Sequence, residues 1–309
     1  MPQVSWRNMS SLLTFFQESV SHTFNPGSFD WFDRAYLVDW IIASIAWIIA
    51  WLIKGLPPFE RDFSLDDPFI NYTHKENQIS GNLTWILALF VPLAFVVIVG
   101  LIRASALEIH HGALGLYVSR AFTALTTEAL KNRVGRLRPD FLSRCKWSEE
   151  LHACRGKLDK VLDGRRSFPS GHSSTAFSGM IFLFLWLAGV TGAWCFSRSI
   201  PSRSLLGSRI ARVCFTLLPI AFATWVAISR VEDYRHHKED VIVGSLIGIG
   251  TATMAYLIYF PNPFSCSTAS DMESNVNRPR LIYRDNEHGR VRNNYNYELA
   301  GMGNATESV

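Results

Sequence analysis

Residues 175–196 read TAFSGMIFLFLWLAGVTGAWCF, a run that contains no charged side chain. A helix needs about 20 apolar residues to cross a hydrocarbon core about 30 Å thick, so this run predicts a membrane span. Five similar stretches are bounded by polar or charged residues, and they are 36–53, 85–102, 112–130, 213–228 and 241–260. We expect an all-α fold, an integral membrane bundle of six transmembrane helices, because no barrel-like alternation is present.

The third stretch, 112–130, is the most polar of the six, because Arg120 and Glu128 interrupt it. Charges within a span usually face the bundle interior and have a partner there, so we count it as a span. The alternative is a long amphipathic helix on the membrane surface. The chain has 309 residues, of which 48% are hydrophobic and 18% charged, and a net charge of +4. This modest charge gives no reason to expect a nucleic acid partner.

The composition divides the chain into three parts. Residues 1–34 precede the first span and include SSLLTFFQESVSHTF, whose apolar residues have nearly helical spacing and predict an interfacial helix. Residues 35–260 hold the six predicted spans. Residues 261–309 are rich in Asn, Arg, Glu and Ser and poor in aliphatic side chains, so we expect a mostly disordered tail.

A long basic segment, 131–174, joins the third and fourth spans. Its first cations, Lys131, Arg136 and Arg138, follow directly on a span and therefore lie at the depth of lipid phosphates. Its last residues, FPSGHSS, are suited to begin a helix whose free backbone N–H groups bind an anion, and His172 lies in the first turn. The alternatives are a solvated cytosolic loop that fixes topology, and an interfacial rather than a catalytic role for His172.

The segment SRVEDYRHHKED at 229–240 places ionisable side chains where the sixth predicted span begins. His236 and Asp240 are four residues apart, so both can lie on one helix face, where the carboxylate accepts the Nδ1 proton. Nε2 is then available as a nucleophile. Spacing alone leaves His237 as an alternative nucleophile. A metal site formed by the two histidines with Glu239 and Asp240 is a further alternative.

Three of these segments resemble the signature motifs of the type-2 phosphatidic acid phosphatase family. KNRVGRLRP at 131–139 matches K-x6-RP, PSGH at 169–172 matches the second motif, and the segment 229–240 matches SR-x5-H-x3-D. The motifs occur in the family's order, between the expected spans. Together with the six-span arrangement, the resemblance covers residues 35–260, with no departure at any signature position.

The resemblance implies a role for each matched residue. His236 is the nucleophile that forms a phosphohistidine, Asp240 orients it, and His172 protonates the leaving group. The phosphate is held by Lys131, Arg138, Ser170, Gly171 and Arg230. The family spacing selects His236 over His237, and family members act with no cofactor and no metal. Glu128 lies three residues before Lys131 and is either its functional partner or part of a structural salt bridge.

Within the family, the segments PPFERDFSLDDPFI and RLRPDFLSRC resemble those of the diacylglycerol pyrophosphate and phosphatidate phosphatases. The implied activity is hydrolysis of phosphatidate, lysophosphatidate or diacylglycerol pyrophosphate, with the phosphorylated lipid and the bilayer as partners. The alternatives are a polyprenyl or sphingoid-base phosphate phosphatase and a non-catalytic protein that binds lipid phosphates. The latter is expected to lack the nucleophile, the acid or the orienting residue, and all three are present.

The family places this site on the lumenal or extracellular side of an endomembrane (vacuole, Golgi or endoplasmic reticulum) or of the plasma membrane. Counting Lys and Arg gives the opposite orientation, because the loop that carries the motifs is the most basic one. We follow the family, since those cations have a phosphate to bind, and the segment 197–212, with arginines and no acid, fits a cytosolic loop. On the lumenal side, Cys145 and Cys154 can form a disulfide; two free thiols are the alternative.

Overall fold

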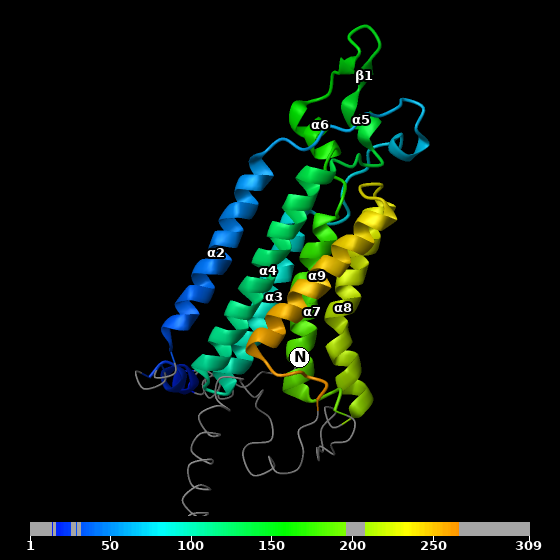
Figure 1. The fold of residues 1–309 in the computed structure, drawn as a ribbon. Helices are drawn as coiled ribbons and strands as arrows, with labels where there is room; N and C mark the ends of the chain where they lie inside the picture. The colour runs from blue at the N-terminus through cyan, green and yellow to red at the C-terminus, as the bar shows by residue number, and fades with distance from the viewer. Residues whose placement is uncertain (1–13, 15–16, 26–28, 30–31, 196–207, 266–309) are drawn as a thin grey trace, which may run out of the picture.

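A computed structural model describes residues 14, 17–25, 29, 32–195 and 208–265 of the chain. The elements in chain order are α2 (Arg34–Gly55), η2 (Pro68–Ile70), α3 (Gly81–Ile102), α4 (Ala106–Val134), α5 (Phe141–Cys145), β1 (Trp147–Ser148), β2 (Ala153–Cys154), α6 (Leu158–Gly164), α7 (Gly171–Thr191), α8 (Arg209–Glu232) and α9 (Lys238–Tyr259). The long helices form a bundle, and the short elements α5, β1 and α6 lie together at one end of it (Figure 1). The predicted mainly helical class is confirmed.

Five of the described helices are long and apolar enough to cross a membrane, and they are α2, α3, α7, α8 and α9. α2, α3 and α8 each contain a predicted span, and α9 ends one residue before the span predicted at 241–260. The span predicted at 175–196 ends too late. α7 ends at Thr191, because Gly192 adopts a left-handed conformation with φ of 56° and terminates the helix. Composition alone did not reveal this end, since the residues that follow are also apolar.

α7 is the central helix of the bundle. It packs against α3, α4, α8 and α9. In its most apolar stretch of 18 residues, 72% is buried, compared with 22% in the corresponding stretches of α2 and α3. Large apolar side chains on the outer helices are exposed, as expected for surfaces that face lipid; examples are Ile48, Ile86, Leu218, Ile242 and Leu246. The chain therefore has the burial pattern of a helical membrane protein, with a packed centre and an apolar outer surface.

α4 contains the polar third stretch and is the longest described helix, with 29 residues. It packs against α2, α3, α7 and α9, so it belongs to the bundle and is not a surface helix. Arg120 is only 2% exposed, and its Nη1 donates to Ser178 Oγ at 2.8 Å and to the Thr175 carbonyl at 3.2 Å. The charge within this helix therefore faces the interior and has partners, as the sequence predicted.

Gly135 directs the chain from the bundle into the small extramembrane region. It has φ of 57°, and a Cβ at this position would lie 2.0 Å from the carbonyl oxygen of Phe59. Any other residue would combine backbone strain with a steric clash. This turn follows the end of α4 at Val134, so Lys131 lies in the last turn of the helix. Arg138 lies on the segment that leaves the turn, and both cations are therefore at the same end of the bundle.

The small region beyond the bundle has its own apolar cluster, in which Phe141 is fully buried against Leu137 and Val161. β1 and β2 form an antiparallel hairpin. A disulfide joins Cys145 to Cys154, so the structure contains the bridge and not the two free thiols. This covalent link and the cluster hold together the segment that carries the first two motifs.

Several predictions fall partly or wholly outside the described residues. The expected interfacial helix at 10–24 is described only in part, and residues 17–23 of it are helical. The segment 196–207 and the tail at 266–309, which includes Cys266, lie outside the described ranges.

Candidate active site

The predicted site residues come together at the end of the bundle that carries the small region. They lie on four helices and the segments next to them: Lys131 in the last turn of α4, Arg138 after it, Ser170, Gly171 and His172 at the start of α7, Arg230 in the last turn of α8, His236 between α8 and α9, and Asp240 in the first turn of α9. His172 lies within electrostatic range of His236, Arg230, Lys131 and Arg138. The fold therefore unites three motifs that are far apart in sequence.

Small residues allow three chain segments to meet at the start of α7. Nζ of Lys131 lies 2.7 Å from the position that a Cβ of Gly171 would occupy, so a side chain there would displace the ammonium group. A Cβ on Gly244 of α9 would lie 2.5 Å from the carbonyl oxygen of Ser170. The N–H of Ser170 also donates to the carbonyl of Asp240 at 2.9 Å. The N-terminus of α7, which was predicted to bind an anion, is thus fixed against both α4 and α9.

His236 does not lie on a helix, which corrects the prediction that it shares a helix face with Asp240. α9 begins at Lys238, with His237 as its N-cap. Nδ1 of His236 lies 2.7 Å from the carbonyl oxygen of Ser167 and 3.8 Å from Oδ2 of Asp240, which is too far for a hydrogen bond. A carbonyl only accepts, so Nδ1 carries the proton, and in the neutral imidazole the lone pair is on Nε2.

The charge state of His236 follows from its environment. The side chain is 2% exposed. Burial and then the positive charge of Arg138 lower the pKa of His236 to about 4, against a smaller opposite effect of Asp240. At neutral pH the imidazole is therefore uncharged and keeps the lone pair that a nucleophile requires.

Asp240 is fully buried and organises the segments around His236. Its Oδ1 accepts from Arg136 Nη1 at 2.8 Å, and its Oδ2 accepts from Ser167 Oγ at 2.5 Å and from the His237 N–H at 3.1 Å. The carboxylate thus holds the residue whose carbonyl contacts His236. It acts on the imidazole through Ser167 rather than by a direct hydrogen bond.

His237 contacts a different backbone carbonyl from the one that His236 contacts. Its Nε2 lies 3.2 Å from the carbonyl oxygen of Leu137, so Nε2 donates its proton there and carries no lone pair for attack. Among the described residues, no three side chains of His, Cys, Asp or Glu converge in the way metal ligands do. Of the two adjacent histidines, the geometry thus favours His236 as the nucleophile.

His172 lies in the first turn of α7, as predicted. Its buried Nε2 makes no hydrogen bond to any residue that the structure describes. It lies 3.5 Å from the position that a Cβ of Gly81, the first residue of α3, would occupy. A buried polar atom without a protein partner is costly, which suggests that this nitrogen is reserved for a ligand.

Both candidate phosphate-binding arginines are held by acidic residues. Nε and Nη2 of Arg138 donate to the carbonyl and to Oδ1 of Asp163, each at 2.9 Å. Burial lowers the pKa of Arg138, and the charge of Asp163 opposes this effect. Arg230 is fully buried, and its Nη2 pairs with Asp233 at 3.1 Å. Lys131 lies 3.4 Å from Glu128, as the predicted salt bridge requires.

The chain is similar in sequence to proteins of one family. Residues 112–264 match the PAP2 superfamily. Lipid phosphate phosphatase 2 of Arabidopsis thaliana is 34% identical over 75% of this chain and 79% of its own length. The chain belongs to the PAP2 superfamily. Diacylglycerol pyrophosphate phosphatase 1 of Saccharomyces cerevisiae is 32% identical, over 72% of this chain and 80% of its own. No solved structure shows a significant match.

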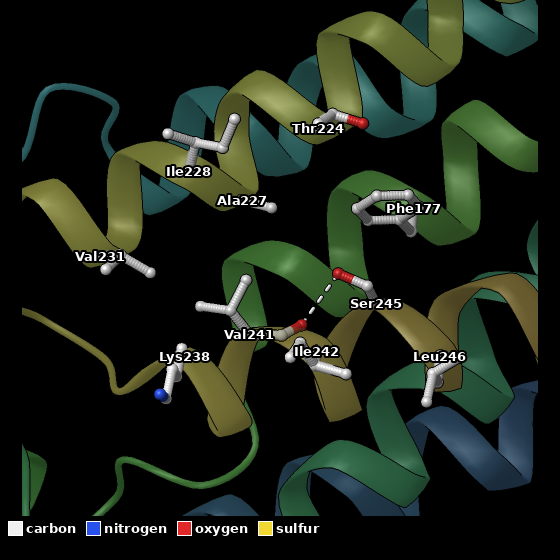
Figure 2. Close-up of a pocket in the computed structure, with 10 residues that line it drawn as sticks. All are labelled: Phe177, Thr224, Ala227, Ile228, Val231, Lys238, Val241, Ile242, Ser245 and Leu246. Carbon is white, nitrogen blue, oxygen red and sulfur yellow. Dashed lines mark hydrogen bonds between the residues drawn. The ribbon is translucent and has the colours of Figure 1, made fainter.

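An apolar groove runs between α8 and α9 over α7, with a volume of about 340 Å³ (Figure 2). It is lined by Phe177, Thr224, Ala227, Ile228, Val231, Lys238, Val241, Ile242, Ser245 and Leu246. Val231 directly follows Arg230, and Val241 directly follows Asp240. Lys238, on the same side of the groove as Val231 and Val241, supplies the one ionisable group among the lining residues (Figure 2).

Sequence reasoning missed two residues that hold this PAP2 site together. Ser167 lies outside the PSGH motif and acts on His236 through its backbone, so its side-chain type carried no signal. Asp163 lies on α6, and its carboxylate contacts both Arg138 at 2.9 Å and Arg144 at 2.7 Å. Burial alone would raise the pKa of Asp163, but these arginines hold it below its ordinary value.

Proposed function

We propose that this chain is a six-span integral membrane phosphatase that removes phosphate from phosphatidate, lysophosphatidate or diacylglycerol pyrophosphate through a phosphohistidine intermediate. Membership of the PAP2 superfamily supports this proposal, together with relatives named lipid phosphate phosphatase and diacylglycerol pyrophosphate phosphatase. In this proposal α4, the third long helix in chain order, also crosses the membrane and brings the number of spans to six. Residues 35–260 are the phosphatase unit, and 1–34 and 261–309 are its terminal extensions.

In the first step, Nε2 of His236 attacks phosphorus and the bond to the leaving oxygen breaks. The imidazolium form of His172, which the negative charge of the bound phosphate stabilises, gives this oxygen a proton, so that a neutral alcohol, or a phosphate monoester from a diphosphate substrate, departs. Lys131, Arg138 and Arg230 stabilise the charge on the equatorial oxygens, together with the hydroxyl of Ser170 and the N–H of Gly171. In the second step, water gives its proton to His172 and attacks phosphorus, which breaks the bond to His236 and releases phosphate.

The contact between His236 Nδ1 and the Ser167 carbonyl, at 2.7 Å, is the observation that carries this proposal. It fixes the proton on Nδ1 and holds the ring, so that the Nε2 lone pair has one direction. The neighbouring cations then bind the anion that Nε2 attacks.

The apolar groove supports a lipid rather than a water-soluble substrate. Two of its lining residues, Val231 and Val241, directly follow Arg230 and Asp240 in the sequence. The groove continues along two helices whose outer side chains are exposed as in a lipid-facing surface (Figure 2). An acyl chain in this groove would lie next to a headgroup whose phosphate is at His236. Lys238, on the same side of the groove as Val231 and Val241, would then favour an anionic headgroup.

The disulfide between Cys145 and Cys154 supports a lumenal or extracellular site, because such bonds persist in oxidising compartments. Both cysteines lie in the segment between α4 and α7, on the side of the bundle that carries the candidate site (Figure 1). We therefore place the site on the exterior or lumenal face of an endomembrane or the plasma membrane.

Phosphate release by the purified full chain, with EDTA present, tests the proposed function. The panel contains phosphatidate, lysophosphatidate, diacylglycerol pyrophosphate, a polyprenyl diphosphate and a sphingoid-base phosphate. We expect turnover of the glycerolipids with no added metal. Preference for either of the last two substrates would assign the alternative activity, and loss of all turnover in EDTA would contradict the metal-independent mechanism.

A further inference from the structure

The loop between α2 and α3 reaches the same end of the bundle as the candidate site (Figure 1). Its last part, residues 72–78, is here called the strap. It lies outside the PAP2 match at 112–264, so no family motif covers it. Gln78 binds Asp233 through its backbone N–H at 3.0 Å and through Nε2 at 2.9 Å. The strap is thereby fixed to the turn that precedes His236.

Two further contacts hold the strap in place. Nδ1 of His74 lies 2.6 Å from Oδ2 of the fully buried Asp140. The ring of Tyr72 stacks on that of Tyr234, with centroids 4.6 Å apart and an interplanar angle of 13°. Contacts on both sides of position 77 therefore fix the strap before any substrate binds.

Asn77 places its side chain against the phosphate-binding arginine: its Oδ1 accepts from Nη1 of Arg230 at 3.1 Å. A guanidinium has five N–H groups, one on Nε and two on each terminal nitrogen. Nε of Arg230 donates to Ser229 Oγ, and Nη2 donates to Ser229 Oγ and to Asp233. Among the described residues, only Asn77 accepts from Nη1, which leaves the second N–H of that nitrogen for a ligand.

We propose that Asn77 is a positioning residue of the phosphate site, which holds Nη1 of Arg230 so that its second N–H points at the substrate phosphate. The inference rests on the proposed function and deepens it. Because a guanidinium is planar, fixing one N–H of Nη1 also fixes the direction of the other. Since Asn77 is neutral, it orients the arginine without adding a second carboxylate to the one that Asp233 already provides.

The test compares Asn77→Ala and Asn77→Asp in the full chain, with Glu76→Ala, its exposed neighbour on the strap, as the matched control. Vanadate inhibition, kcat, KM and thermal unfolding are measured for each. We expect Asn77→Ala to lower kcat/KM about tenfold, the effect of losing one hydrogen bond to a charged group. Asn77→Asp keeps the hydrogen-bond acceptor but places a further carboxylate next to Arg230. We therefore expect vanadate to bind the Asn77→Asp variant more weakly than the Asn77→Ala variant. Glu76→Ala should resemble the wild type.

A merely structural role makes the opposite prediction for the aspartate variant. If Asn77 only supported the fold, Asn77→Asp, which keeps the contact with Arg230, would restore both stability and vanadate inhibition. That result would overturn the inference, as would equal effects of Glu76→Ala and Asn77→Ala. Thermal stabilisation by vanadate distinguishes a failure of the proposed phosphate site from a failure of the proposed role of Asn77. If vanadate fails to stabilise the wild type, the phosphate site itself is refuted; if it stabilises wild type and Asn77→Asp equally, only the role of Asn77 fails.

Discussion

Nδ1 of His236 lies 2.7 Å from the backbone carbonyl of Ser167, and the side chain of the same serine donates to Asp240 at 2.5 Å. One residue therefore links the candidate nucleophile to the buried carboxylate that the family resemblance names as its orienting partner. A backbone acceptor is held by the chain on both sides, so it restricts the imidazole more firmly than a rotatable carboxylate can. This geometry leaves the Nε2 lone pair of His236 available for attack, whereas Nε2 of the adjacent His237 donates to a carbonyl.

We expect His236→Ala to lose several orders of magnitude in turnover, the usual result of removing a covalent nucleophile. His237→Ala should retain most of the activity, because its Nε2 is occupied by the Leu137 carbonyl at 3.2 Å. The measurement is kcat with phosphatidate, and thermal unfolding confirms that both variants fold. Equal losses in two folded variants would refute the assignment of the nucleophile.

The pH dependence of kcat/KM should reflect the lowered pKa of His236. Burial, and then the charge of Arg138, lower this pKa from 6.5 to about 4, so the free enzyme keeps a neutral imidazole well below pH 6.5. Between pH 6.5 and 4 the unfolded chain takes up a proton that the folded chain does not, so stability decreases as the pH falls. We expect an acidic limb near pH 4, and a loss of stability from pH 7 to 5 that is smaller in His236→Gln. A limb at 6.5 would contradict the assigned environment.

Arg138→Lys should lower kcat/KM strongly although it keeps the charge. The guanidinium uses one edge to bind Asp163 at 2.9 Å and has further N–H groups for phosphate, whereas an ammonium offers one compact donor. Arg155→Lys is the matched control, because Arg155 is an exposed residue of the same extramembrane region. Steady-state kinetics on both variants checks the prediction. Near-normal kcat/KM in Arg138→Lys would show that net charge alone is sufficient at this position.

Filling the groove should impair the hydrolysis of lipids more than that of small substrates. Ala227 points into the groove from α8, and Ala227→Phe would occupy part of the space proposed for an acyl chain (Figure 2). Ala221→Phe, at an exposed position on the same helix, is the control. We expect Ala227→Phe to lower kcat/KM for long-chain phosphatidate but not for a water-soluble phosphate monoester. Equal losses on both substrates would place the acyl chain elsewhere.

Sidedness can be tested by glycosylation at the β1–β2 hairpin, which projects away from the bundle (Figure 1). Glu149→Asn with Leu151→Thr creates an acceptor site between the two strands, and both residues are exposed. We expect modification in microsomes, because the disulfide at Cys145 and Cys154 favours an oxidising compartment. The natural acceptor at Asn304 is the control and should remain unmodified. Modification of Asn304 together with an unmodified hairpin would reverse the proposed topology.

The amino-acid sequence by itself determined the helical class, the approximate span positions and the motif residues that meet at one end of the bundle. This succeeded because the signals are local: a long apolar run predicts a buried or lipid-facing helix, and a Pro-Ser-Gly segment predicts a helix start. The prediction of a helix end failed where an apolar run continues past a glycine that terminates the helix. The apolar run after Thr191 suggested a longer span, but Gly192 ends the helix there.

Only the tertiary structure decided what surrounds each motif residue. The spacing between His236 and Asp240 suggested a shared helix face, but α9 begins at Lys238, and a carbonyl from another segment contacts the imidazole. A backbone carbonyl is present at every residue, so it leaves no trace in the sequence. Asn77 reaches Arg230 across more than 150 residues, through a loop that no motif covers. Packing brings such groups together, and packing depends on the whole chain rather than on neighbouring residues.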